Sequence, residues 1–311
     1  MDSMNILRGD AFENRYRIEG TLRTTSPLHI GNGNSEPREG LEKEADNGKT
    51  EKIQVTSIER DFSGKPYIPG STLRGKIRHW LLVILKSFGP KWASDRDYEK
   101  LFRDPEFQDQ RRQIEFMRND ASVLERLFGS AFSNSKIDFW DAFCITDPHS
   151  LTGRNVSLDR RTAPYWIAER LTYVGQSVAI DPETGTALDK KLYHLELVPE
   201  GIQFKLVICG QNLSDLEVGL LLFALKGFNS FIFPLTLGAM TGRGFGHMNF
   251  ELNNIYRLKR DQSQIHNWLK CALDNDAAGF EALDAFDQTS QDAFINSFKA
   301  AFLMDKGEKN V

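Results

Sequence analysis

The stretch Leu237–Met248, LGAMTGRGFGHM, places glycines at positions 238, 242, 244 and 246 around one arginine, Arg243. Glycine adopts positive φ without steric cost, so successive amides can turn toward one point and a phosphate can approach the main chain. Arg243 adds a positive fork at the same place. The spacing fits neither a dinucleotide fingerprint nor a phosphate loop, which argues against a nucleotide cofactor. We interpret the stretch as a phosphate-contacting loop between strands at Phe231–Leu237 and Gly246–Tyr256, with a purely structural loop as the alternative.

Composition indicates a globular protein. The chain has 311 residues, 40% of them hydrophobic and 11% aromatic, enough for the core of one large or two ordinary domains. Neither an apolar run of membrane-spanning length nor an apolar signal core occurs, so we expect no membrane partner and a cytoplasmic location. Cys144, Cys209 and Cys271 lie far apart, which gives no support to a disulfide frame or a zinc site.

The net charge of −4 is unevenly distributed along the chain. From Asp261 to the end there are nine Asp or Glu and four Lys or Arg, a charge of −5, which leaves +1 for residues 1–260. A nearly neutral body can still carry one basic face. The charge balance therefore permits RNA binding without requiring it.

Apolar spacing and capping residues predict the order of the core elements. Alternating apolar residues predict strands, and apolar residues three or four apart after a serine predict capped helices. A turn at Pro199–Gly201 separates two alternating runs, which we expect to pair as neighbouring strands. The core elements are a strand at Tyr16–His29, a helix from Ser71, a central strand at Lys136–Thr146, the two runs within Leu192–Cys209, a helix from Ser214 to Phe228 and a strand at Gly246–Tyr256.

Three polar segments interrupt this order. Asn34–Thr50 has no period and is predicted to be a mobile loop before a strand at Glu51–Ile58. The charge-dense segment Gly89–Asp120 predicts an inserted helical lid, and Ser122–Glu125 predicts a capping box after it. Gly153–Lys191 is a long polar excursion, and loops of this length inside a domain are usually functional.

Without the insertions, the order is strand, helix, strand, strand, helix, strand. This predicts an α+β protein with a ferredoxin-like β-α-β-β-α-β core, the sheet also used by RNA-recognition modules. We place this domain at residues 14–257, with insertions at 34–54 and 89–127 and a hairpin at 153–191. Residues 258–311 are predicted to be an acidic helical extension with Phe294, Phe298 and Phe302 on one face.

Two features favour an RNA partner. The helix from Ser71 carries Arg74, Lys76 and Arg78 opposite its apolar stripe, and no acidic residue occurs from Ser71 to Lys86. Such a face is often simply solvated, but without acidic residues it suits a phosphate partner. In the 153–191 excursion, Tyr165 and Trp166 are large rings in polar surroundings. They suit stacking on bases, with a small satellite core under the loop as the alternative.

Five motifs occur in order over roughly residues 14–257. They are Ser26–Gly31 (SPLHIG), Tyr67–Arg78 (YIPGSTLRGKIR), the strand Ile137–Ala142 after Leu127–Gly129 (LFG), the pattern LY…E…VP…G…F from Leu192 to Phe204, and Gly242–Gly246 (GRGFG). With these motifs the chain resembles the RAMP superfamily, the repeat-associated proteins of CRISPR effector complexes. Within it, the chain is most similar to the backbone subunit of type III effectors, which polymerises along guide RNA.

The resemblance implies a role in antiviral defence with guide RNA, target RNA and other effector subunits, including neighbouring backbone subunits, as partners. The glycine loop and the start of the Ser71 helix would grip guide phosphates. The 153–191 excursion would be a thumb hairpin that separates guide–target base pairs. The RNA-binding residues are then His29, Ser71, Arg74, Lys76, Arg78, Arg160, Tyr165, Trp166, Gly242, Arg243, Gly244, Phe245 and Gly246.

Three functions remain open. The protein can be a non-catalytic RNA-binding scaffold. It can cleave target RNA with Mg²⁺ or another divalent cation, and Asp46 is then the candidate catalytic residue. Several family members that cleave carry an aspartate shortly before the strand that leads to the Pro-Gly-Ser turn. This chain has Glu51–Val55 (EKIQV) at that place, without an aspartate. It can also process guide RNA without metal, with His29 as general base.

Overall fold

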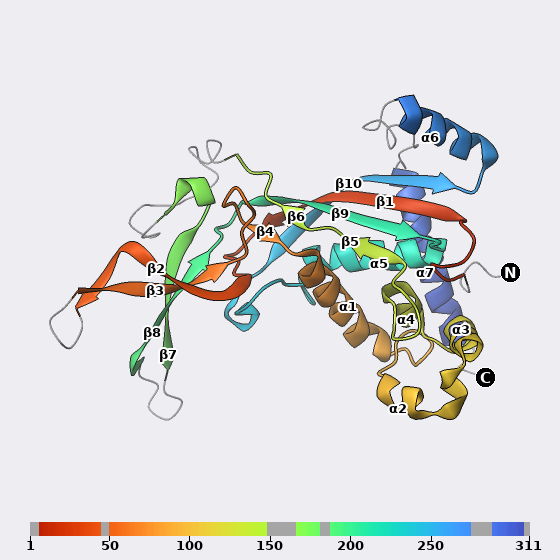
Figure 1. The fold of residues 1–311 in the computed structure, drawn as a ribbon, viewed down its shortest axis with the longest axis horizontal. Helices are drawn as coiled ribbons and strands as arrows, with labels where there is room; N and C mark the ends of the chain where they lie inside the picture. The colour runs from red at the N-terminus through yellow and green to blue at the C-terminus, as the bar shows by residue number, and fades with distance from the viewer. Residues whose placement is uncertain (1–5, 45–49, 148–165, 181–186, 275–287, 308–311) are drawn as a thin grey trace.

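The computed structural model describes residues 6–44, 50–147, 166–180, 187–274 and 288–307 and shows a mixed α+β protein (Figure 1). Its first sheet has the order β10-β1-β9-β5, with antiparallel neighbours throughout. Helices lie against one face of this sheet, and a second sheet extends away from one end of it. The strands of the first sheet are β1 (Asn14–Thr24), β5 (Ile137–Phe139), β9 (Gln203–Gln211) and β10 (Met248–Lys259).

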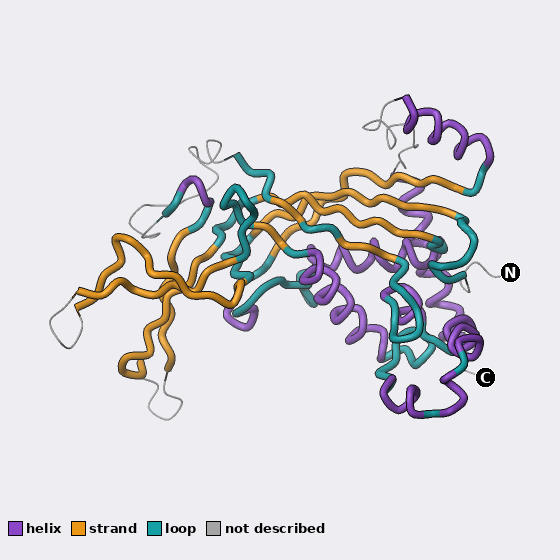
Figure 2. Tube along the Cα trace, in the orientation of Figure 1, coloured by secondary structure: helices purple, strands orange, loops and turns teal. Residues whose placement is uncertain are grey.

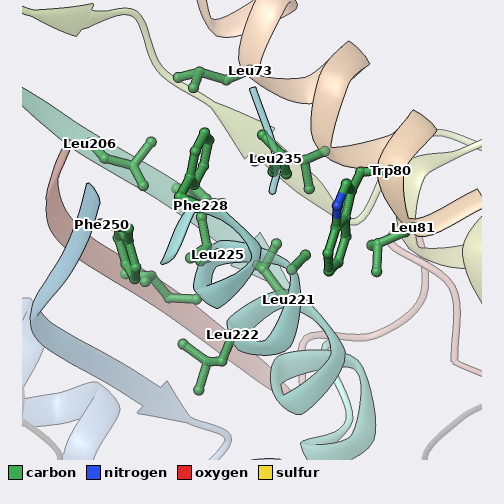
Figure 3. Close-up of a cluster of buried hydrophobic side chains, with 14 of the residues drawn as sticks. Leu73, Trp80, Leu81, Leu206, Leu221, Leu222, Leu225, Phe228, Leu235 and Phe250 are labelled. Carbon is green, nitrogen blue, oxygen red and sulfur yellow. The ribbon is translucent and has the colours of Figure 1, made fainter. Parts of the chain in front are cut away.

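The core lies between the first sheet and its helices. Along β1, Tyr16, Ile18 and Leu22 are buried on the helix side, as the alternation predicted, while Arg15 and Arg17 face the other side. Figure 3 shows the apolar side chains of the two central helices meeting over this face. These helices are α1 (Gly70–Lys86) and α5 (Asp215–Lys226).

The predicted second helix and tail helix are both confirmed. Ser214 and Glu217 form a complete capping box at the start of α5. The tail helix α7 (Gln288–Gly307) buries Phe294 and Phe298 against the main core. A Cβ on Gly219 of α5 would fall 2.1 Å from the carbonyl oxygen of Phe294, so this glycine allows the two helices to approach closely.

Helix α1 begins differently from the prediction. Ser71 is not its cap: the N-cap is Pro69, which has no side chain to accept a hydrogen bond, and Ser71 is exposed. The carboxylate of Asp141 accepts the Gly70 N–H at 2.7 Å instead. The sequence could not show this, because Asp141 is distant in the chain and reaches α1 only when the strands have assembled.

The second sheet has the order β2-β3-β8-β7 and projects as two hairpins from the left of the first sheet (Figure 2). Its strands are β2 (Gly31–Glu44), β3 (Thr50–Ile58), β7 (Tyr173–Ile180) and β8 (Ala187–Leu197). The prediction of a mobile loop at Asn34–Thr50 was therefore wrong over residues 34–44. This segment pairs with β3, as in Ser35↔Thr56 and Glu42↔Lys52. Backbone hydrogen bonds hold β2 against β3. Most of the described residues of β2 are exposed, so the strand forms without an alternation of apolar and polar residues.

Three other strand predictions were wrong. The segment Lys136–Thr146 is not a central strand, because β5 lies at the sheet edge and the segment is interrupted before β6 (Ala142–Phe143), which pairs with β4 (Tyr67–Ile68). The runs around Pro199–Gly201 are strands but do not pair, since β8 belongs to the second sheet, between β3 and β7, and β9 belongs to the first. Phe231–Leu237 forms no strand and lies alongside α1, where the Phe233 carbonyl accepts the Trp80 indole N–H at 3.1 Å.

The inserted segment is helical, as predicted, with its own small core around Leu7, Phe116 and Met117. The capping box of Ser122 and Glu125 is confirmed. The segment contains α2 (Tyr98–Arg103), η2 (Pro105–Gln108), α3 (Gln110–Asn119) and α4 (Val123–Phe128); the remaining short or peripheral elements are η4 (Ala168–Arg170), η5 (Gly227–Asn229), η6 (Thr241–Arg243) and α6 (Gln262–Asp274).

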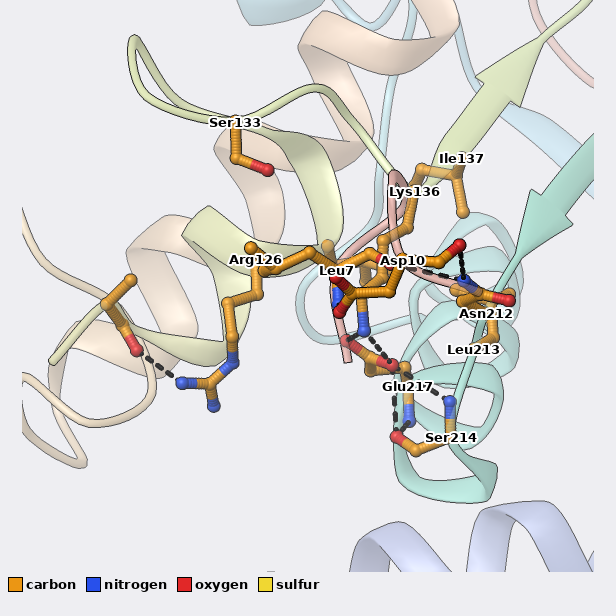
Figure 4. A network of polar contacts seen from close by, with 12 residues as sticks. Leu7, Asp10, Arg126, Ser133, Lys136, Ile137, Asn212, Leu213, Ser214 and Glu217 are labelled. Carbon is orange, nitrogen blue, oxygen red and sulfur yellow. Dashed lines mark hydrogen bonds and ion pairs between the residues drawn. The ribbon is translucent and has the colours of Figure 1, made fainter. Parts of the chain in front are cut away.

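A buried ion pair fastens β5 to α5 (Figure 4). The Lys136 ammonium lies 2.9 and 3.0 Å from the two carboxylate oxygens of Glu217, and both side chains are almost fully buried. The same carboxylate accepts the Ser214 N–H at 2.9 Å. The cap of α5 and the edge strand therefore share one charged centre.

Strand β10 is the other edge of the first sheet, and one side chain covers part of it. The Asn229 carboxamide accepts the Phe250 N–H and donates to the Phe250 carbonyl, both at 2.8 Å. Over the described residues, no helix is long and apolar enough to cross a membrane.

Candidate nucleic-acid interface

A groove of about 470 Å³ runs along one flank of α1. Arg74, Gly75 and Arg78 form one wall. The turn that joins α4 to β5 forms the other wall. Its lining residues are Phe128, Gly129, Ser130, Ser133, Asn134 and Ser135.

The groove holds two guanidinium groups without a carboxylate in its lining. Arg74 donates a hydrogen bond to the Phe128 carbonyl. Burial, together with the nearby charge of Arg78, lowers the pKa of Arg74 from its usual value. Arg78 forms no ion pair with the described residues, whereas Lys86 further along α1 is paired with Asp95. Excess positive charge at partly buried arginines is the arrangement that an anionic ligand stabilises.

The positive region ends toward the C-terminal end of α1. The next hollow along the helix is lined by Arg78 and Arg96 but also by Asp95, Asp97 and Glu125. Three carboxylates there disfavour a polyanion. An extended phosphate chain would therefore run from Arg78 toward the start of α1.

The predicted basic face of α1 divides into two flanks. Arg74 and Arg78 are spaced by four residues and share the groove flank. Ser71 lies one turn before Arg74 but is not part of the groove lining. Lys76 follows Arg74 by two residues, about 200° around the helix, and lies on the opposite flank. Lys76 is not part of the groove lining.

The glycine loop contains two structurally different pairs of glycines. A Cβ on Gly238 would fall 2.3 Å from the His29 carbonyl oxygen, and one on Gly246 would fall 1.9 Å from the Leu237 carbonyl oxygen. These two glycines permit close backbone packing. At Gly242 and Gly244 a Cβ would have no atom within 4 Å, so this part of the loop is open to a ligand.

Arg243 projects from the open part of the loop and is held by the second sheet. Its Nη1 donates to the Tyr193 hydroxyl of β8 at 2.7 Å. Arg243 is exposed, and Phe245 is half-buried. The remaining donors of the guanidinium can therefore reach a ligand while one donor is fixed.

His29 lies beneath the loop rather than at its surface. Its side chain is buried, and Nδ1 lies 2.8 Å from the Glu196 carbonyl oxygen. Because a carbonyl only accepts, Nδ1 must carry the proton of this bond. The histidine connects the backbone of the SPLHIG motif to β8.

Glu196 is the centre of a buried ion-pair network that the sequence did not indicate. Its carboxylate lies 3.0 Å from Arg38 and 3.4 Å from Arg60, and it accepts the Thr172 hydroxyl at 2.9 Å. Arg60 also pairs with Glu36 at 2.9 Å. The only sequence signal was the place of Glu196 between Tyr193 and Val198 in one of the motifs, since its partners come from distant parts of the chain.

The other predicted residues fall into two groups. Trp166 is half-buried and packs against the main core rather than in a separate satellite core. Asp46, Arg160 and Tyr165 lie outside the described residues. Among the residues that the structure describes, no group of three or more His, Cys, Asp or Glu side chains is arranged to hold a metal ion.

The sequence was compared with known protein families. The family described as the RAMP superfamily matches residues 21–249, more than two thirds of the chain. The chain belongs to the RAMP superfamily. Proteins of this superfamily are CRISPR-associated, bind CRISPR RNA and assemble with other Cas subunits. The match spans the SPLHIG motif, the groove and the glycine loop of this RAMP protein. No curated protein matches the sequence.

Proposed function

We propose that this RAMP protein is the backbone subunit of a type III CRISPR effector complex and binds guide RNA through the α1 groove and the glycine loop. The observation that carries the proposal is the pair Arg74 and Arg78, which lines a groove without carboxylates. Arginine forks bind phosphates in two-point geometry, and backbone contacts of this kind do not read sequence. Binding is therefore to the RNA backbone.

The finer fold assignment is part of this proposal. The chain order β1, α1, β5, β9, α5, β10 around the first sheet supports a ferredoxin-like β-α-β-β-α-β core. The sheet face opposite the helices is mostly charged on its two central strands. These strands carry Arg15, Arg17 and Glu19 on β1 and Lys205 and Val207 on β9 at this face. Two rings lie beside Arg17: Tyr256 is its neighbour on β10, and the exposed Trp140 ring stacks with its guanidinium. We place the guide on the helix side because the groove with Arg74 and Arg78 and without carboxylates lies there.

The second sheet supports the predicted thumb. The hairpin of β7 and β8 projects away from the helices and is joined to the glycine loop through Tyr193 and Arg243. We propose that this hairpin contacts the guide–target duplex. The proposal extends to Arg160 and Tyr165 as RNA contacts within the same excursion.

The test is a charge reversal on the groove flank. The double variant Arg74→Glu and Arg78→Glu should lose the RNA that co-purifies with the protein, because two phosphate contacts become repulsive. The matched control reverses Arg103 and Arg111, two exposed arginines of the helical insert that lie outside the groove. It should retain the RNA at the same salt concentration. Equal RNA content in both double variants would exclude the α1 groove as the guide site.

Target cleavage is a separate part of the proposal and is assigned to Asp46. The described residues contain no cluster of metal ligands, so this assignment rests on Asp46 and its place in the sequence. In a guide-loaded complex, Asp46→Asn should abolish divalent-cation-dependent cleavage without changing guide binding. Cleavage that persists in EDTA would instead favour metal-free processing, and an intact complex that cleaves nothing would be a scaffold.

A further inference from the structure

The wall opposite Arg74 and Arg78 is a rigid turn. Gly129 has φ +82°, and a Cβ there would fall 2.6 Å from the Ser135 nitrogen. The Ser130 N–H donates to the Ser133 carbonyl at 2.9 Å and closes the turn. The side chains of this wall are therefore presented from a fixed backbone.

Two of the polar side chains in this wall serve the turn itself. The Ser130 hydroxyl accepts the Phe132 N–H at 3.1 Å and contacts the Met117 sulfur. The Ser135 hydroxyl donates to the Ile137 carbonyl at 2.7 Å. Neither hydroxyl needs a ligand to satisfy its hydrogen bonding.

The other two polar side chains are available. The Asn134 carboxamide forms no hydrogen bond with the described part of the chain, and Asn134 is exposed. The Ser133 hydroxyl has only a long contact of 3.4 Å with the Asn134 carbonyl. A carboxamide and a hydroxyl together offer both donors and acceptors to the groove.

We propose that Ser133 and Asn134 bind the ribose 2′-hydroxyl of an RNA strand whose phosphates are held by Arg74 and Arg78. This inference rests on the proposed function and names how the same site selects its ligand. In a nucleic-acid backbone each sugar lies between two phosphates. If the two arginines on one wall of the groove hold the phosphates, the polar side chains on the opposite wall face the sugar between them. The 2′-hydroxyl donates and accepts, and it is the group that distinguishes RNA from DNA.

Two features of the groove favour the sugar over the base as the group that is read. Its one ring, Phe128, is fully buried and offers no face for stacking. Gly75 has no side chain, and a Cβ there would meet no atom within 4 Å, so the nucleic-acid backbone can lie directly on α1. The groove therefore selects RNA over DNA without selecting sequence.

The test compares RNA with DNA on the full chain freed of nucleic acid. The probes are one single-stranded RNA and a single-stranded DNA of the same sequence. The DNA carries uracil in place of thymine, so the two probes differ only in the 2′-hydroxyl. The double variant Ser133→Ala and Asn134→Ala should bind RNA about 5- to 10-fold more weakly and DNA equally well, since one or two hydrogen bonds are lost only with the ribose. The charge reversal at Arg74 and Arg78 should weaken both probes alike.

A matched control is Asn249→Ala, which removes an exposed carboxamide on the sheet face away from α1 and should leave both affinities unchanged. If the Ser133 and Asn134 variant loses RNA and DNA affinity equally, the wall only shapes the groove and the inference fails while the proposed function stands. The same holds if the unaltered protein binds RNA and DNA equally. If the unaltered protein binds neither probe, the proposed function fails with it.

Discussion

Glu217 and Glu196 are both buried carboxylates, but they have different partners. Among the described residues Glu217 forms an ion pair with one cation, Lys136, whose side chain is also fully buried. Glu196 has two, Arg38 and Arg60, which retain 12% and 14% exposure of their side chains. The first centre lies in the core under the first sheet, and the second lies where the strands of the second sheet meet.

The difference shows that burial of a charge does not by itself define its role. The Lys136–Glu217 pair is neutral and closed, so loss of one member leaves the other charge in the core. At Glu196 the arginines can reach water or a further anion, and Glu36 already occupies Arg60 from the exposed side. The first centre should therefore control the stability of the whole domain, and the second should control the order of the projecting hairpins.

The largest effect is expected for Lys136→Met. It leaves the Glu217 carboxylate buried without its ion-pair partner, and breaking a buried pair costs about 3–5 kcal/mol. The free energy of unfolding from urea titration measures this loss. Adding Glu217→Gln should restore most of it, because the glutamine keeps polar atoms for the α5 cap without a charge. A loss below about 1 kcal/mol in the single variant, the size of an exposed pair, would contradict the closed-pair interpretation.

Glu196→Gln should have a smaller and more local effect. It removes charged hydrogen bonds to Arg38 and Arg60, worth about 1.5–3 kcal/mol, but the arginines remain partly solvated. Amide hydrogen exchange should show reduced protection in β2, β3 and β8 with little change in β1 and β9. Equal loss of protection in both sheets would remove the distinction between the two centres.

Glu36→Gln tests the exposed side of the second centre. The Glu36–Arg60 pair is partly exposed, so its loss should cost at most about 1 kcal/mol. The hydrogen bond from Arg60 holds the pKa of Glu36 below its usual value. The free energy of unfolding in urea should fall less in Glu36→Gln than in Glu196→Gln, because Glu196 is buried and pairs with Arg38 as well as Arg60. A larger loss in Glu36→Gln would reverse that ranking.

The smallest effect is a loss of stability at acid pH, and its source is a histidine of the second sheet. Burial lowers the pKa of His194 on β8, and its Nε2 has no hydrogen-bond partner among the residues that the structure describes. The unfolded chain, with a histidine pKa of about 6.5, then binds the proton more readily than the folded protein. This contribution to stability is complete above that pH and is lost as the pH falls through the folded-state pKa. In His194→Leu the free energy of unfolding, measured by urea titration at several pH values, should change less over this range. The same pH dependence as in the unaltered protein would exclude His194 as its source.

Local signals predicted the helices best. The capping boxes at Ser122 and Ser214 and the phenylalanine face of α7 each depend on residues three or four apart, and all three are present. The alternation in β1 was equally local. The cap of α1 failed because its acceptor, Asp141, comes from a distant loop.

The pairing of strands and the buried ion pairs could not be predicted from the sequence, because they depend on contacts between residues far apart in the chain. The polar strand β2 has no apolar alternation over most of its exposed part because it is held by pairing with β3 rather than by burial. The pairs of Lys136 with Glu217 and of Glu196 with Arg38 join residues far apart in the chain. The groove itself joins α1 to a turn that comes much later in the chain, so the sequence predicted Arg74 and Arg78 but not the wall that faces them.

Asn229 has a consequence for how copies of this protein avoid one another. An uncovered edge strand offers N–H and C=O groups to any passing strand, which is a common start of aggregation. The Asn229 carboxamide presents one acceptor and one donor to Phe250, the same pair of bonds that an incoming strand would make. One side chain thus acts as a stop for strand addition at this point of β10, and its replacement by alanine would leave a template for unwanted fibrous association.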